Sequence, residues 1–185
     1  MAAADPHNWA PGPASNPRTR EETASAFVEA QMALAAPRQI MLRCAAVMAE
    51  PVPAAQRLER IVGLLARELR ADVCSCFIQR PGEVLELFAA SGLPVDAAHH
   101  AKLRVGEGVI GDIAASAVPQ TLRDMTTHPQ FALRPETGGA DFRGFCGVPV
   151  LRAGHVRGVL VIQNRLARSY GPEVIDILET AAMLV

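Results

Sequence analysis

The sequence has few aromatic residues, almost no lysine and no excess of positive charge. Aromatic side chains make up 4% of the 185 residues, and Lys102 is the only lysine among 18 basic residues, which 19 acidic residues balance. Proteins that bind nucleic acid need a basic surface and, for unpaired bases, stacking rings. Because both features are missing, we do not expect nucleic acid to be a partner.

Long apolar runs are also missing. Charged residues interrupt every apolar stretch before it reaches the ~18–20 residues that a membrane-spanning helix needs, so we expect no membrane partner. The first 17 residues contain four prolines and no basic segment followed by an apolar one, which is unlike a secretory signal. With half of its residues hydrophobic and a net charge of -1, the chain has the composition of a globular domain, expected in the cytoplasm.

The cysteines show no C-x-x-C pair and no Cys/His spacing typical of a zinc site, so no metal is expected. Cys74 and Cys76 are two residues apart on an expected strand and therefore share a face. A catalytic dithiol is one interpretation of this pair, and a pair of small buried apolar side chains is the other. Cys44 and Cys146 complete the set.

The chain divides into three parts by composition. Residues 1–20 are rich in Pro, Ala, Asn and Ser and are expected to form a disordered tail, because they have little to bury. Residues 21–50 show helical periodicity on both sides of Pro37 and are expected to form a helical extension of two short helices. Residues 51–185 form the expected domain, whose last helix begins at Pro172 and lacks a stop signal, so we expect it to continue in the parent protein.

Within residues 51–185 the hydrophobic period changes from helical to strand-like and back. An amphipathic helix over 58–70 precedes two strands joined by a turn at 80–83, and a second hairpin joins strands at 145–152 and 158–164 through a loop at 153–157. Between the hairpins lie a short strand at 103–105, a helix at 109–117, a strand at 119–122 and a long irregular segment at 124–143. Hairpins imply antiparallel pairing, so we predict an α+β fold with an antiparallel sheet of five or six strands and helices on its faces.

Several segments carry a resemblance to a known family. The glycine-rich passage at 103–114 and the order of elements are similar to a GAF domain. The segments at 128–138, 147–152 and 158–164 resemble, more specifically, the amino-terminal sensory domain of the nitrogen-branch phosphoenolpyruvate-protein phosphotransferases. The resemblance covers about residues 58–185.

The resemblance implies a regulatory domain, without catalysis by this chain itself. In that family the phosphotransfer chemistry belongs to downstream phosphotransferase domains, and the sensory domain is thought to respond to glutamine, with 2-oxoglutarate as the opposing signal. The helices that flank the sheet would pass the change to the attached domains and would also serve for pairing with a second copy. Two alternatives stay open: a thiol reductase acting on methionine sulfoxide, and a dimerisation module without a ligand.

The candidate ligand site is the long segment at 124–143. A free amino acid offers a carboxylate, best bound by a guanidinium, and an ammonium, best bound by a carboxylate. We therefore assign Arg134 to the carboxylate and Glu136 or Asp112 to the ammonium. The other candidate ligand-binding residues of this site are Thr137, Asp124, Phe131, Phe145 and Gln163.

Each assignment has a structural alternative. Arg134 and Glu136 would otherwise pair with each other in solvent, and Asp124 would cap the loop by accepting backbone N–H bonds. For Phe131 and Phe145 the alternative, which the residue type favours, is core packing, and for Gln163 and Asn164 it is a hydrogen bond at a strand end.

One motif spells the dinucleotide fingerprint G-x-G-x-x-G, at residues 106–111. Its context differs from that of a dinucleotide site, because the preceding strand is short and the strands before it form a hairpin. We therefore predict a tight turn that starts a helix.

Overall fold

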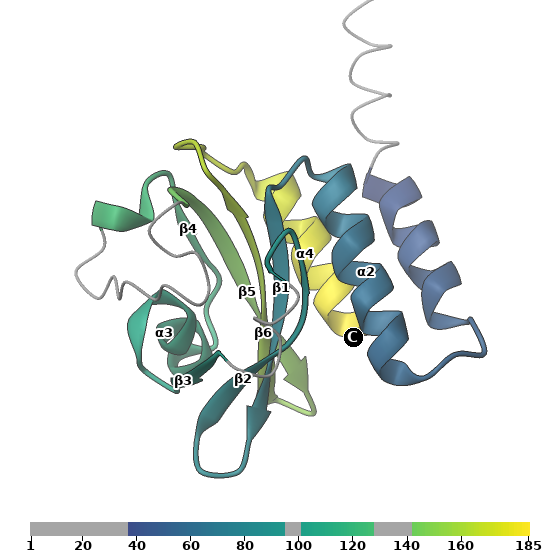
Figure 1. Cartoon of the computed structure of the whole chain (residues 1–185), viewed down its shortest axis with the longest axis horizontal. Helices are drawn as coiled ribbons and strands as arrows, with labels where there is room; N and C mark the ends of the chain where they lie inside the picture. Colours follow the sequence, from purple (N-terminus) through teal and green to yellow (C-terminus); the bar gives the residue numbers. More distant parts are fainter. Residues whose placement is uncertain (1–36, 95–100, 128–141) are drawn as a thin grey trace, which may run out of the picture. The chain divides into compact units, whose positions relative to one another are not determined.

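The computed structural model describes residues 37–94, 101–127 and 142–185. They contain one antiparallel sheet of six strands in the order β3-β2-β1-β6-β5-β4 (Figure 1). The strands are β1 (Val73–Arg80), β2 (Val84–Ser91), β3 (Lys102–Arg104), β4 (Gln120–Leu122), β5 (Gly144–Arg152) and β6 (His155–Asn164). The predicted α+β fold with an antiparallel sheet is confirmed.

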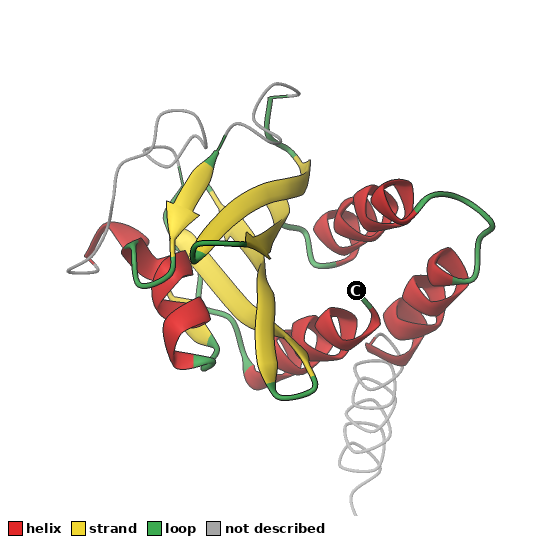
Figure 2. Cartoon of the chain, turned by 90° about the horizontal axis from the view of Figure 1, so that it is seen from below, coloured by secondary structure: helices red, strands yellow, loops and turns green. Residues whose placement is uncertain are grey.

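Helices cover both faces of this sheet (Figure 2). Helix α2 (Ala54–Glu68) packs on β1 and β2, and helix α4 (Pro172–Leu184) packs on β5 and β6. The shorter helix α3 (Gly108–Ser116) lies on the opposite face, against β3, β5 and β6. A 3-10 turn, η2 (Met125–Thr127), follows β4.

Helix α2 shows why the sequence forms this layer. Its buried residues Leu58, Ile61, Val62 and Leu65 recur at helical spacing and turn one apolar stripe toward the sheet. Residues 37–48 form a further helix whose Ile40 and Cys44 join the same core. Ion pairs from Arg43 to Glu68 and from Arg60 to Glu50 connect this helix and the turn after it to α2. The boundaries drawn from composition at residues 20 and 50 stay predictions.

The alternation of side chains along β6 divides the core into two clusters. Val159 and Val161 point toward α3, whereas Leu160 and Ile162 point toward α2 and α4. All four are fully buried. Continuing this alternation, the last two residues of the strand, Gln163 and Asn164, lie on opposite faces of the sheet.

The hairpin between β5 and β6 is tighter than its sequence predicted. We expected a loop at 153–157 and a strand from Gly158, but β6 begins at His155, so that only two residues form the turn. Both turn residues have positive φ, 49° at Ala153 and 78° at Gly154. Two-residue turns with this geometry match the twist of the flanking strands, and Gly154 adopts it without steric cost.

Candidate functional site

Four of the candidate ligand residues cannot be placed by the structure. Arg134, Glu136, Thr137 and Phe131 lie outside the described residues, in the segment 128–141. Their assignments to the ligand stay predictions. The described candidates are Asp112, Asp124, Phe145 and Gln163.

Gln163 lies at the end of β6 on the face of the sheet that α3 covers. Its side chain is buried, and its neighbours across the sheet are Val73 on β1 and Phe145 on β5. Its amide Nε2 donates to the thioether Sδ of Met125 at 3.5 Å, which is its one side-chain hydrogen bond within the described residues. A thioether is a weak acceptor, so this buried amide retains most of its capacity to bind a polar group.

Phe145 is a core residue. Its side chain is fully buried in the cluster under α3, together with Ile113. A Cβ added at Gly147 would come within 2.9 Å of the Phe145 ring and 2.7 Å of Ile113 Cδ1. The absent side chain at Gly147 therefore lets α3 pack close to β5, with Phe145 beside it.

Asp124 caps the turn that follows β4. Its Oδ1 accepts hydrogen bonds from the Thr126 backbone N–H at 3.1 Å and from Thr126 Oγ1 at 2.6 Å. Its Oδ2 lies 3.7 Å from Arg143 Nε. The hydroxyl bond from Thr126 and the nearby guanidinium lower the pKa of this carboxyl group. The structure thus shows the capping role, and ligand binding by Asp124 stays a prediction.

Asp112 is also engaged. Its Oδ2 accepts a hydrogen bond from Gln120 Nε2 at 3.1 Å, which links α3 to β4. A ligand ammonium would have to share this carboxylate with Gln120.

Asn164, the neighbour of Gln163, is the centre of a polar network on the opposite face. Its Nδ2 donates to Arg70 O at 3.0 Å and to Asp72 Oδ2 at 3.2 Å. Its Oδ1 accepts from Tyr170 OH at 2.7 Å and from Arg168 NH1 at 3.3 Å. One side chain therefore connects the segment after α2 with the segment that leads into α4.

Arg168 extends the network to the end of α2. Its guanidinium donates to Leu69 O and Arg70 O, both at 3.0 Å, and lies over the Tyr170 ring. These carbonyls follow the last turn of a helix, where free acceptors attract a cation. Asp72 completes the network by accepting the Arg165 backbone N–H at 2.8 Å.

All four cysteines are free and buried in the cluster between the sheet and α2 and α4. Burial raises the pKa of Cys44 to about 11 and that of Cys76 and Cys146 to about 12, and it also raises the pKa of Cys74. The thiolate is the reactive form, so we expect these thiols to react slowly at neutral pH. This confirms the interpretation of the cysteines as buried apolar side chains.

Native-state thiol labelling checks this arrangement. At about pH 8, where an ordinary exposed thiol is partly ionised, we expect no rapid reaction with a disulfide reagent such as dithionitrobenzoate. The same protein in denaturant should react at all four cysteines, which serves as the control. A thiol of the native protein that reacts within seconds would contradict the burial described here.

The G-x-G-x-x-G segment forms the turn that starts α3. Gly106 and Gly108 have positive φ, 82° and 65°. At Gly111 a Cβ would lie only 2.4 Å from Arg104 O, so the third glycine lets the helix pack against β3. Strand β3 has three residues and pairs antiparallel, unlike the buried parallel strand of a dinucleotide site. The segment is a structural turn, as predicted.

Two further classes of site are absent from the described residues. No group of His, Cys, Asp or Glu in the ranges 37–94, 101–127 and 142–185 is arranged to hold a metal ion. Within the same ranges no helix has both the length and the apolar character needed to cross a membrane.

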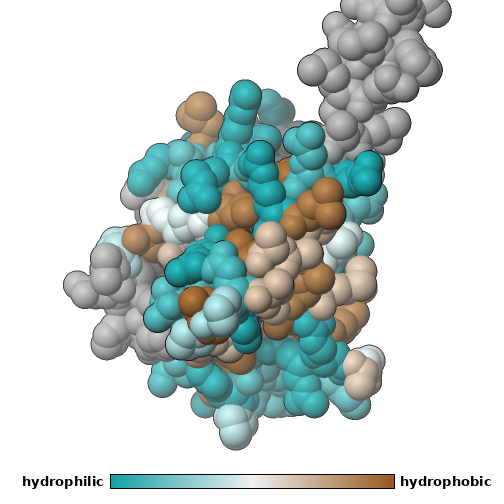
Figure 3. Space-filling model, turned by 90° about the vertical axis from the view of Figure 1, so that its right-hand side faces the viewer, coloured by the Kyte–Doolittle hydropathy of each residue, from teal (hydrophilic) through white to brown (hydrophobic). Residues whose placement is uncertain are grey.

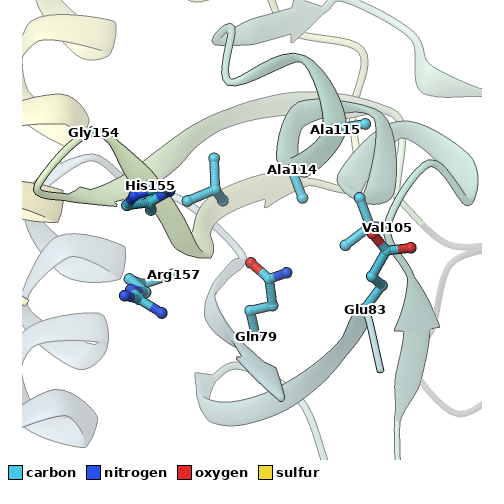
Figure 4. Close-up of a pocket in the computed structure, with 9 residues that line it drawn as sticks. Gln79, Glu83, Val105, Ala114, Ala115, Gly154, His155 and Arg157 are labelled. Atoms are coloured by element: carbon cyan, nitrogen blue, oxygen red, sulfur yellow. The ribbon is translucent and has the colours of Figure 1, made fainter. Parts of the chain in front are cut away.

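Sequence reasoning missed a cleft of about 490 Å³ at the end of the sheet where the two hairpins turn (Figure 4). Its polar side chains are Gln79 on β1, Glu83 in the β1–β2 turn, and His155 and Arg157 on β6. Ala114 and Ala115 of α3 also line it, and the Ala114 side chain points toward Gln79. Turn residues in the sequence predict the two hairpin turns, but no pattern predicts that α3 lies next to them.

Comparison with known proteins agrees with this architecture. The family model of the GAF domain matches residues 53–185. Among solved structures, the GAF domain of a phosphoenolpyruvate-protein phosphotransferase from Coxiella burnetii is 34% identical, with a TM-score of 0.73 over 81% of this chain and 88% of that chain. A free methionine-R-sulfoxide reductase from Neisseria meningitidis shares the fold, with 17% identity and a TM-score of 0.69 over 80% of this chain and 84% of that one.

Among curated proteins, the chain is similar to the Nif-specific regulatory protein of Azospirillum lipoferum. The two are 32% identical over 114 residues, which is 59% of this chain and 18% of that protein. The chain thus spans about a fifth of the length of the curated relatives it matches. GAF domains are generally regulatory sensor domains. With the family model matching most of its length, the chain belongs to the GAF domain family.

Proposed function

We propose that this chain is the small-molecule-sensing domain of a phosphoenolpyruvate-protein phosphotransferase of the nitrogen-related phosphotransferase system. Its ligand would be glutamine or 2-oxoglutarate, and its effect would be to control autophosphorylation of the attached domains. The observation that carries the proposal is the 34% identity to the Coxiella burnetii phosphotransferase GAF domain over most of both chains. Its similarity to Nif-specific regulatory proteins supports the broader assignment to a regulatory domain.

Gln163 supports the position of the ligand site. The amide is buried on the α3 face, next to Met125, and its hydrogen-bonding capacity is mostly unused by the described residues. A primary amide both donates and accepts, which suits the side-chain amide of glutamine or a carboxylate of 2-oxoglutarate. Arg134 and Glu136 would supply the charges from the segment that follows Met125.

The end of β6 offers a route from the ligand to the helices. Gln163 faces the proposed ligand, and the adjacent Asn164 holds the residues after α2 and before α4 through its four hydrogen bonds. A ligand that binds better to one position of this strand end shifts the population of that position. The helices α2 and α4 would move with it, because Asn164 and Arg168 attach them to the strand.

The helical side of the domain would serve for pairing with a second copy. Figure 3 shows apolar side chains between polar ones on this side. Leu42 on the helix at 37–48 and Met183 on α4 are large apolar residues that remain exposed. Burial of such residues between two copies would add a hydrophobic contribution to association.

The reductase alternative has little support in the structure. A reductase needs an accessible thiolate, but burial keeps Cys74, Cys76 and Cys146 protonated on the face away from α3. The methionine-R-sulfoxide reductase comparison, at 17% identity, shows a shared fold alone.

Isothermal titration calorimetry tests the sensing proposal. We expect glutamine or 2-oxoglutarate to bind with a dissociation constant in about the micromolar to millimolar range. Glutamate serves as the control for the side-chain amide. If none of the three binds at about millimolar concentration, the amino-acid proposal fails and a dimerisation module without a ligand becomes the better account.

A further inference from the structure

We propose that the cleft between the two hairpin turns and α3 is a second small-molecule site, which takes a zwitterion of the α-amino-acid class. This site is separate from the one proposed above. Along β1, Val73 pairs with Gln163 and Gln79 lies six residues further on. At about 3.3 Å per residue, the two ends of the sheet are ~20 Å apart.

Opposite charges stand on different walls of the cleft. Glu83 is on the β1–β2 turn, and His155 and Arg157 are on β6, with Gln79 between them (Figure 4). None of these four side chains makes a hydrogen bond or ion pair with any described residue, so all of them are available to a ligand. Their separation on two walls keeps the carboxylate and the guanidinium from neutralising each other directly.

The chemistry of these groups defines the ligand. A guanidinium binds a carboxylate through paired N–H donors, and a carboxylate binds an ammonium. The amide of Gln79 both donates and accepts, and therefore suits a polar side chain. The cleft is open to solvent, and its volume of about 490 Å³ leaves room for a small molecule. An α-amino acid meets both charge requirements at this size.

The backbone at Glu83 shows how the hairpin turn is built. Its φ is 59°, in the left-handed region that residues other than Gly, Asn and Asp rarely adopt. A backbone hydrogen bond from Val105 N to Glu83 O, at 2.9 Å, extends the pairing of β2 with β3 to this turn. Glu83 is the last residue of the three-residue loop between β1 and β2, where a left-handed backbone is ordinary hairpin geometry. The turn places Glu83 in the lining of the cleft.

The α3 wall of the cleft is kept open by small side chains. Ala114 and Ala115 are the residues of α3 that line the cleft. Ala115 is exposed, so a larger residue there would fill the cleft and leave the core unchanged.

Two-dimensional ¹H–¹⁵N NMR with L-glutamine as the probe tests this site. We expect saturable shifts of the amides of Glu83, Gly154 and Arg157 as the probe is raised to about 50 mM. Glutaramate, which is glutamine without its α-ammonium, should bind about tenfold more weakly at these amides. Glu83→Gln should remove that difference between the two probes, because the partner of the ammonium is gone.

Two variants separate this site from the one at Gln163. Ala115→Leu should abolish the shifts at the hairpin turns, whereas Gln163→Leu should leave them unchanged. Shifts confined to residues around Met125 and Phe145 would overturn the cleft proposal and leave the sensing proposal intact. Equal binding of both probes by the unmodified protein would also overturn it.

Discussion

Replacing Phe145 by alanine is expected to lower the free energy of unfolding by about 3–5 kcal/mol, the usual cost of removing a buried aromatic side chain. The ring is fully buried under α3, beside Ile113 and Gly147. Its loss leaves a cavity that the neighbouring side chains fill only in part. Chemical denaturation, followed by circular dichroism, measures the change.

A graded series keeps this prediction testable if the alanine variant does not fold. Phe145→Leu retains much of the buried volume and should cost about 1–2 kcal/mol. Val118→Ala, at a residue that is 55% exposed, is the control and should change stability by less than about 0.5 kcal/mol. If Phe145→Leu were neutral and weakened only ligand binding, Phe145 would be a pocket wall and not a core residue.

Replacing Asn164 by alanine is expected to destabilise the domain by about 2–4 kcal/mol. The side chain makes four hydrogen bonds, two of them to the charged groups of Asp72 and Arg168. Without it, the buried hydroxyl of Tyr170 loses its partner, and burial of an unpaired polar group is costly. Denaturation curves of Asn164→Ala and of the nearby control Leu166→Ala give the difference.

A double-mutant cycle assigns the effect to the network. Tyr170→Phe removes the hydroxyl that donates to Asn164 Oδ1. In the Asn164→Ala background this second change should cost less than in the unmodified protein, by about 0.5–3 kcal/mol, because the pair acts together. Fully additive effects would contradict the hydrogen bond between these two side chains.

The parts of the fold that depend on local pattern were predictable from the sequence. The stripe Leu58, Ile61, Val62 and Leu65 indicates a helix with one buried face. Turn residues between short apolar runs indicate the hairpins, and both hairpins are present. The sequence pattern predicts a longer loop than the two-residue turn at Ala153, because a positive φ is unusual for alanine.

The candidate site was less predictable because its contacts join distant parts of the chain. Asn164 bonds to Arg70, which is 94 residues away. The sequence leaves two roles open for the adjacent amides of Gln163 and Asn164. Only the register of β6 shows that Gln163 faces α3 and that Asn164 faces α2 and α4. The cleft at Glu83 was missed for the same reason, since its walls come from three separate segments.

The central claim is that a ligand binds beside Gln163, on the face of the sheet that α3 covers. Calorimetric titration of Gln163→Leu, beside the unmodified protein, tests it most directly. Leucine has nearly the same volume and suits the buried position, so the fold should remain. We expect the affinity for glutamine or 2-oxoglutarate to fall by about tenfold or more, the effect of losing a buried hydrogen-bonding partner. The matched variant Gln56→Leu, at an exposed position of α2 outside both proposed sites, should keep that affinity. Unchanged affinity in Gln163→Leu would contradict the claim.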